Sequence, residues 1–210
     1  MKLLLVGSTG LVGRLVLTLA LDDSRINEVV VLSRKALSVE HEKLRTLLVD
    51  FDNLPDDPSL WKVDAVICTL GTTMRVAGSK EAFRLVDYSY PLIIAKKADE
   101  QGTRSYVLNS ASGANSDSAI FYNRVKGELE QALIGLGFTS LTLVRPGLIG
   151  GERSEFRLGE SVGVAVLSLF GPILPRRLRI NPAPKIAGAL LESAIQGSGG
   201  VRVVSSEQLI

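Results

Sequence analysis

A tyrosine and a lysine stand four residues apart in a stretch of helical periodicity, Tyr122 and Lys126. At this spacing both side chains lie on one face of a helix. A phenol has a pKa of about 10 and is a poor acid or base at neutral pH, but a nearby ammonium favours the phenolate. The pair therefore predicts an acid/base group, Tyr122, assisted by the charge of Lys126. A packing tyrosine beside a solvated lysine is the alternative for this spacing alone.

A glycine-rich segment near the start of the chain has the spacing of a dinucleotide-binding loop. It follows the apolar residues 3–6 and opens a helical pattern. Glycine permits the tight turn, the approach of a pyrophosphate to the backbone, and close packing of helix on strand. The first N–H groups of the helix then face the phosphates. Cofactor contacts are expected from Gly7, Ser8, Thr9, Gly10, Leu11, Val12 and Gly13, unless the loop is only a structural turn.

The residues after the second apolar run indicate which nicotinamide dinucleotide is preferred. An Asp or Glu at this place binds the ribose hydroxyls of NAD. This chain has Ser33, Arg34 and Lys35 there instead. A guanidinium can pair with a 2′-phosphate and stack on adenine. We therefore expect NADP(H) to be preferred over NAD(H), the alternative being that Arg34 and Lys35 are solvated surface cations.

Three further segments are expected around the same ligands. Asp50 and Phe51 follow the third apolar run, where the carboxylate can accept from the adenine amino group. Small residues after the fourth run let the cofactor pass close to the backbone; the expected contacts are Thr69, Leu70, Gly71 and Thr72. After the fifth run, a serine hydroxyl can hold a substrate carbonyl oxygen while Tyr122 protonates it, because ligands bind at the carboxyl edge of such sheets. Lys126 can also bind the cofactor ribose.

Short apolar runs alternate with helical patterns along the chain. Their continuous hydrophobicity is typical of parallel strands covered on both faces. The alternation predicts an α/β fold, a Rossmann-like doubly wound parallel sheet with helices on both faces. The expected strands are residues 3–6, 29–32, 47–49, 65–68, 106–108, 141–144 and 201–204, and the expected helices are 11–21, 91–101, 120–136 and 182–196.

Length, charge and composition limit the function. The 210 residues, with no linker between apolar segments, predict a single domain over residues 1–210. A net charge of +2 gives no general nucleic-acid footprint. One cysteine and one histidine exclude an internal disulfide and predict no metal site. We see no signal peptide and no apolar run of transmembrane length, so a cytoplasmic location is expected.

On these residues the chain resembles the short-chain dehydrogenase/reductases, specifically their atypical, short, NAD(P)H-binding branch. The matching pieces occur in the family's order over about residues 1–150: residues 7–13, Arg34, residues 68–73, Ser110, residues 122–128 and residues 145–149. The resemblance implies that Ser110, Tyr122 and Lys126 are the catalytic residues. It also implies that Pro146, Gly147 and Ile149 lie beside the nicotinamide.

The chain departs from the family at the end of the fifth strand. Many relatives carry two adjacent serines there, and the second place is Ala111 in this sequence. Either Ser110 or Ser112 must then take the polar role. Ser110 is preferred, because it lies 12 residues before Tyr122, close to the family interval.

These observations predict an NADP(H)-dependent oxidoreductase acting on a small carbonyl or alcohol substrate. The alternative is a non-catalytic NADPH-binding redox sensor or interaction protein, favoured by Ala111. A nucleotide-dependent epimerase or dehydratase is less favoured, because residues from about 150 to 180 form only a small substrate-side lid. The apolar run 162–170 and the basic cluster 176–179 in this region could also contact a partner, and a homodimer is compatible with the fold.

Overall fold

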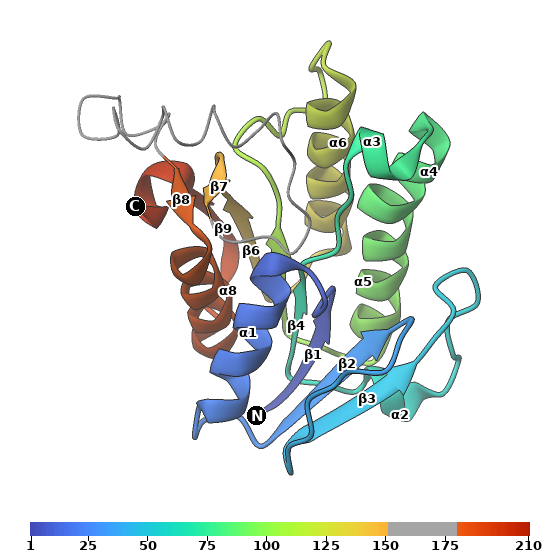
Figure 1. Ribbon diagram of the computed structural model, residues 1–210, viewed down its shortest axis with the longest axis vertical. Helices are drawn as coiled ribbons and strands as arrows, with labels where there is room; N and C mark the ends of the chain where they lie inside the picture. Colours follow the sequence, from blue (N-terminus) through green and yellow to red (C-terminus); the bar gives the residue numbers. More distant parts are fainter. Residues whose placement is uncertain (151–179) are drawn as a thin grey trace.

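The computed structural model describes residues 1–150 and 180–210, and its centre is a parallel sheet of seven strands (Figure 1). The strand order is β3-β2-β1-β4-β5-β6-β9, and every neighbouring pair is parallel. The strands are β1 (Lys2–Val6), β2 (Glu28–Ser33), β3 (Leu44–Leu48), β4 (Ala65–Cys68), β5 (Ser105–Asn109), β6 (Ser140–Arg145) and β9 (Gly200–Ser205).

The strand order reverses direction between β1 and β4. From β1 the chain adds β2 and then β3 on one side, and afterwards crosses to β4 on the other side of β1. The connections that follow β1 and β4 therefore run in opposite directions along the sheet, and the carboxyl ends of these two strands form a topological switch point. In open α/β sheets this is where ligands bind.

Helices cover both faces of the sheet because the central strands are apolar on both faces. One core cluster packs strand residues against α1 (Leu11–Asp22) and α8 (Ala183–Gln196). The other packs them against α5 (Tyr90–Glu100) and α6 (Phe121–Leu136), and Figure 1 shows these two pairs on opposite sides of the sheet. In β5, Val107 belongs to the first cluster while Tyr106 and Leu108 belong to the second, as the two-residue period of a strand requires.

Several short elements complete the described chain. They are the helices α2 (Pro58–Trp61), α3 (Met74–Ala77) and α4 (Lys80–Arg84), the π-helix η1 (Leu85–Ser89) and the 3-10 helix η3 (Ser206–Leu209). A separate two-stranded sheet joins β7 (Ile149–Gly150) to β8 (Asn181–Pro182).

The fold class predicted from the sequence is confirmed. The third strand begins three residues earlier than predicted, at Leu44. It lies at the edge of the sheet and is half exposed, so its apolar signal is weak. The lid predicted at about 150–180, with its apolar run and basic cluster, falls almost entirely outside the described residues. None of the described helices has the length and apolar character needed to cross a bilayer.

Candidate active site

The glycine loop lies at the switch point of the sheet. Gly7 has a φ of +89°, a left-handed conformation that glycine adopts without strain. A Cβ atom on Gly7 would lie 2.6 Å from the carbonyl carbon of Thr69, so this loop touches the loop after β4. A Cβ atom on Gly13 would lie 2.1 Å from the Gly7 oxygen. Gly7 and Gly13 are therefore required by the packing of the protein itself.

The middle glycine has different surroundings. Among the residues that the structure describes, a Cβ atom on Gly10 would meet only the Gly7 oxygen, at 3.5 Å, so they leave the space beside Gly10 open. Gly10 is the N-cap of α1, and among the described side chains none caps this helix end. The first N–H groups of α1 and its positive dipole end are therefore available to an anion. Ser8 adds a buried hydroxyl that has no hydrogen-bond partner in the described part of the chain.

Arg34 and Lys35 are exposed at the end of β2. Within residues 1–150 and 180–210, neither side chain forms an ion pair. Ser33 is buried instead, and its hydroxyl donates to the Lys35 carbonyl at 2.7 Å and so shapes the turn. As far as the described residues go, the Arg34 guanidinium is available to bind a phosphate, whereas the Ser33 hydroxyl already donates to the Lys35 carbonyl.

Acidic and aromatic side chains gather after β3. The Tyr90 hydroxyl donates to Oδ1 of Asp52 at 2.7 Å, and the Phe51 and Tyr90 rings lie 5.4 Å apart. Asp50 is exposed, and its Oδ1 accepts the Asp52 N–H at 3.0 Å. Burial and the hydrogen bond to Asp52 raise the pKa of Tyr90 to about 12. The predicted adenine contacts, Asp50 and Phe51, therefore belong to one ordered group with Asp52 and Tyr90.

Lys126 forms a buried ion pair that the sequence did not reveal. Its Nζ lies 2.8 Å from Oδ1 of Asp87, and the two side chains are 4% and 1% exposed. The other Asp87 oxygen accepts the Thr72 N–H at 2.8 Å. Burial lowers the pKa of Lys126, but the neighbouring Asp87 and Tyr122 more than compensate, so its pKa is raised above the usual value. The lysine is therefore held as a cation beside the loop that contains Gly71 and Thr72.

Tyr122 lies one turn before Lys126 on α6, with its ring packed against the buried ring of Phe83 at 5.6 Å. Phe83 contacts the Phe121 ring at the same distance. Phe83 belongs to α4, which leads directly into η1 and hence to Asp87. The same short segment therefore orients both Tyr122 and Lys126.

Ser110 has a different environment from the one predicted for a substrate-binding group. It is 5% exposed, and its hydroxyl donates to Oε1 of Glu130. Glu130 is 1% exposed and also accepts two hydrogen bonds from the Arg145 guanidinium, one from Nε at 3.0 Å. These hydrogen bonds raise the pKa of Arg145. One buried carboxylate thus connects β5, α6 and β6, and we call Ser110, Glu130 and Arg145 the Glu130 clamp.

The segment after β6 is held by a buried asparagine. Oδ1 of Asn181 accepts the Gly147 N–H at 2.7 Å, and its Nδ2 donates to the Ser206 carbonyl at 2.8 Å. Its backbone N–H donates to the Leu148 carbonyl, and Ile149 pairs with it in the β7–β8 sheet. Asn181 therefore fixes the segment in which Pro146, Gly147 and Ile149 were predicted to contact the cofactor.

The structure brings most of the predicted residues to one edge of the sheet. The glycine loop, the β4 loop and Lys126 are joined through Thr69, Asp87 and Thr72.

Three residues of the site were not predicted from the sequence: Asp87, Glu130 and Asn181. Glu130 could have been predicted, since Tyr122, Lys126 and Glu130 are spaced four residues apart and so lie along one helix face. Asp87 and Asn181 could not have been predicted, because their hydrogen-bond and ion-pair partners are distant in the sequence.

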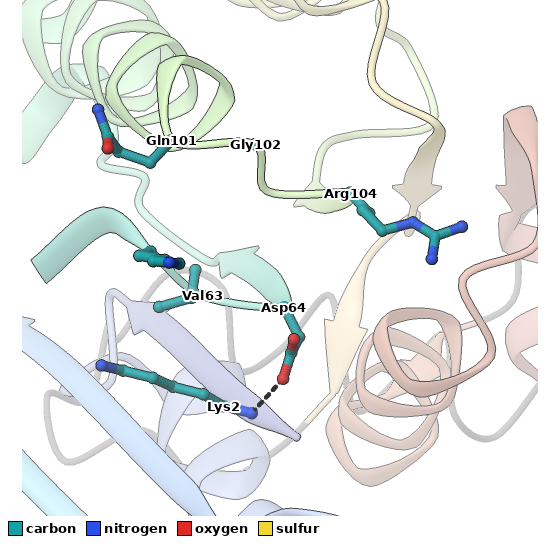
Figure 2. Close-up of a pocket in the computed structure, with 7 residues that line it drawn as sticks. Lys2, Val63, Asp64, Gln101, Gly102 and Arg104 are labelled. Atoms are coloured by element: carbon teal, nitrogen blue, oxygen red, sulfur yellow. Dashed lines mark hydrogen bonds between the residues drawn. The ribbon is translucent and has the colours of Figure 1, made fainter. Parts of the chain in front are cut away.

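A pocket of about 360 Å³ lies at the opposite, amino-terminal edge of the sheet. Figure 2 shows it beside the starts of β1, β4 and β5, where the Lys2 N–H donates to Oδ2 of Asp64 at 2.6 Å. Ligands of open α/β sheets bind at the carboxyl edge, so this pocket is not part of the candidate site. Its lining residues are Lys2, Lys62, Val63, Asp64, Gln101, Gly102 and Arg104.

Comparison with known proteins identifies the family. No protein-family model matches the chain. The mitochondrial protein Fmp52 of Aspergillus fumigatus is 34% identical over 178 residues, which cover 80% of this chain and 75% of the relative. Fmp52 of Emericella nidulans is 36% identical over 170 residues, covering 75% and 71% of the two chains. The chain belongs to the Fmp52 family.

The family membership corrects the predicted location. The Fmp52 proteins of Aspergillus, Emericella, Meyerozyma and Candida are all named mitochondrial. The cytoplasmic location expected from the sequence is therefore wrong. The expectation rested on the apparent lack of a targeting segment at the start of the sequence, which is weak ground for assigning a compartment.

Solved structures support the fold of this Fmp52 family member. MoeE5 in complex with UDP-glucose and NAD superposes with a TM-score of 0.75 at 14% identity, covering 98% of this chain and 75% of the other. The oxidoreductase ylbE from Lactococcus lactis superposes with a TM-score of 0.70 at 18% identity, covering 100% of this chain and 95% of the other. A dTDP-4-dehydrorhamnose reductase from Clostridium acetobutylicum superposes with a TM-score of 0.66 at 15% identity, covering 98% of this chain and 74% of the other. At these identities the similarity shows the Rossmann-like fold.

Proposed function

We propose that the chain is an NADP(H)-dependent oxidoreductase of the atypical short-chain dehydrogenase/reductase type, acting on a small carbonyl or alcohol substrate. The observation that carries this proposal is the buried Lys126–Asp87 pair beside Tyr122, joined through Thr72 to the β4 loop. That loop is in direct contact with the glycine loop. The named activities of structural neighbours, an oxidoreductase and a reductase, agree with it. The names of the family members support a mitochondrial location.

The residues present fit a dinucleotide. A diphosphate would lie beside Gly10, where the described residues leave the backbone uncovered, and the N-terminal N–H groups of α1 and the buried Ser8 hydroxyl would supply donors. Asp50 and Phe51 would border the adenine, Arg34 would bind the 2′-phosphate, and Lys126 would bind the ribose on the nicotinamide side. The absence of an acid among Ser33, Arg34 and Lys35 removes the usual partner of unphosphorylated ribose.

In the direction of carbonyl reduction, NADPH held at this site would supply the hydride. Tyr122 transfers its phenolic proton to the carbonyl oxygen, so that the product is an alcohol and the side chain becomes a phenolate. Lys126 stabilises this phenolate by its charge, and Asp87 keeps the lysine protonated and in place. A proton from solvent restores Tyr122, which closes the cycle.

Cofactor preference is the first measurable consequence. Titration of the protein with NADPH and NADH, followed by cofactor fluorescence, is expected to give tighter binding of NADPH. Replacing Arg34 with Asp is expected to remove the preference, because the carboxylate repels a 2′-phosphate and accepts from ribose hydroxyls. The exposed Arg45 on β3 serves as a control for the loss of one surface cation, through Arg45→Asp.

The titration also tests the proposal as a whole. Failure of both cofactors to bind would contradict it, since the glycine loop would then be only structural. Unchanged selectivity in Arg34→Asp would remove Arg34 from the 2′-phosphate site and leave the rest of the proposal intact.

A second candidate function is a non-catalytic NADPH-binding sensor. It is favoured by Ala111 at the place of the second serine and by the engagement of the Ser110 hydroxyl with Glu130. This function would bind NADPH without consuming it and would capture a partner only when the cofactor is bound. Stoichiometric oxidation of NADPH by carbonyl compounds distinguishes the enzyme from the sensor.

A further inference from the structure

The hydroxyl group of Ser110 is already committed to a buried acceptor. A serine hydroxyl has one hydrogen to donate, and Ser110 donates it to the carboxylate of Glu130. A hydroxyl that holds a substrate carbonyl oxygen must donate to that oxygen. If Ser110 did so, the buried Glu130 carboxylate would lose a charge-assisted hydrogen bond. The Glu130 clamp therefore opposes the role predicted for Ser110.

The backbone shows where the next serine along the chain, Ser112, lies. The Ser110 N–H donates to the Val144 carbonyl at 2.7 Å, and the Ser112 N–H donates to the Pro146 carbonyl at 2.8 Å. Donor and acceptor each advance by two residues between these bonds, so the parallel pairing of β5 with β6 continues beyond Asn109, the last residue of β5. Ser112 and Gly113 then form a turn, which the Ala114 N–H closes by donating to the Ala111 carbonyl at 3.0 Å. A Cβ atom on Gly113 would lie 2.7 Å from Oδ1 of Asn123, so this turn lies against the start of α6, at the residue after Tyr122.

The rise of the two elements places Ser112 level with the catalytic pair. Two residues of a strand rise about 6.6 Å. Lys126 lies four residues before Glu130 on α6, which corresponds to about 6 Å along the helix axis, and Tyr122 lies one turn before Lys126. Since Ser110 is level with Glu130, Ser112 is level with Lys126 and next to the turn that carries Tyr122.

Ser112 also has the freedom that Ser110 lacks. It is exposed, and its hydroxyl has no hydrogen-bond partner among residues 1–150 and 180–210. Its backbone bond to Pro146 places it beside the segment expected to contact the nicotinamide. The intervening Ala111 has no polar atom in its side chain, so it cannot take the role.

We propose that Ser112 supplies the hydroxyl that holds the substrate oxygen, and that Ser110 has only a structural role in the Glu130 clamp. This assignment rests on the proposed oxidoreductase function. It makes Ser112 a catalytic residue of that reaction, acting together with Tyr122 and Lys126.

Two alanine variants separate the two serines. Ser112→Ala is expected to lower kcat/KM for reduction of benzaldehyde or phenanthrenequinone with NADPH by about 100-fold, the effect of losing one donor to a developing oxyanion. Its Tm should stay within about 1 °C of the wild type, because the side chain is exposed. Ser110→Ala is expected to lower the Tm by about 3–8 °C, because a buried carboxylate loses a donor. Its kcat/KM should stay within about 3-fold well below that Tm.

Ser112→Thr is the matched control, since it keeps a hydroxyl at the same place and is expected to retain most of the turnover. Loss of turnover in Ser110→Ala with normal turnover in Ser112→Ala would overturn the assignment. An unchanged Tm in Ser110→Ala would overturn the structural role of Ser110. If the wild type binds NADPH but reduces no carbonyl compound, the oxidoreductase proposal fails and the Ser112 role fails with it, whereas the melting data still decide the role of Ser110.

Discussion

Replacing Tyr122 with Phe is expected to lower kcat for carbonyl reduction by about 100- to 10,000-fold, the usual contribution of a positioned general acid. The phenyl ring keeps its contact with Phe83, so the fold and the position of Lys126 are retained. The affinity for NADPH should therefore stay within a few-fold of the wild type. Steady-state kinetics and a fluorescence titration on the same preparation measure the two quantities.

Tyr88→Phe provides a control on the same protein. Its ring lies under the Arg84 guanidinium at 4.4 Å, on η1 rather than on α6. Loss of this hydroxyl should leave kcat nearly unchanged. Normal turnover in Tyr122→Phe would remove the phenol from the mechanism, and an equal loss in both variants would point to a general effect on folding.

Replacing Asp87 with Ala is expected to cost about 3–5 kcal/mol of unfolding free energy, the typical penalty for removing one partner of a buried ion pair. The variant leaves the Lys126 ammonium buried without a counterion, and it leaves the Thr72 N–H without its acceptor. Turnover should fall as well, because a buried lysine without a counterion loses its proton more readily. Denaturant unfolding measures the stability.

The Asp56–Lys97 pair is the matched control for this variant. Its atoms are as close, at 2.6 Å, but the Asp56 side chain is almost fully exposed. Asp56→Ala should leave the unfolding free energy nearly unchanged, since water screens exposed pairs. Equal effects of Asp87→Ala and Asp56→Ala would show that burial does not determine the strength of the Asp87 pair.

The central sheet could be predicted from the sequence because its strands are apolar on both faces. Residues 29–32 and 65–68 are almost completely buried, and their continuous apolar runs mark them without ambiguity. The edge strand β3 was placed three residues late, because Arg45 and Thr46 interrupt its apolar pattern. The two-residue strands β7 and β8 and the short helices α2 to α4 are too brief to produce a periodic signal.

The candidate site was predictable only where the chemistry is local. The glycine spacing and the Tyr122–Lys126 spacing lie within single segments and are visible in the sequence. The partner of Lys126 is not, because Asp87 lies 39 residues away in a helical stretch where an acid normally faces solvent. The preference for Ser110 over Ser112 came from an interval in the sequence, and the hydrogen bond from Ser110 to Glu130 argues against it.

The pairing of β7 with β8 brings together two segments that are far apart in the sequence. The chain leaves the described fold after Gly150 and returns at Ile180 and Asn181, and a Cβ atom on Gly150 would lie 2.5 Å from Cγ2 of Ile180. The two ends of the intervening 29 residues are thus joined at their base. Because β7 and β8 form a sheet of their own, the register of the seven-stranded sheet does not depend on this junction.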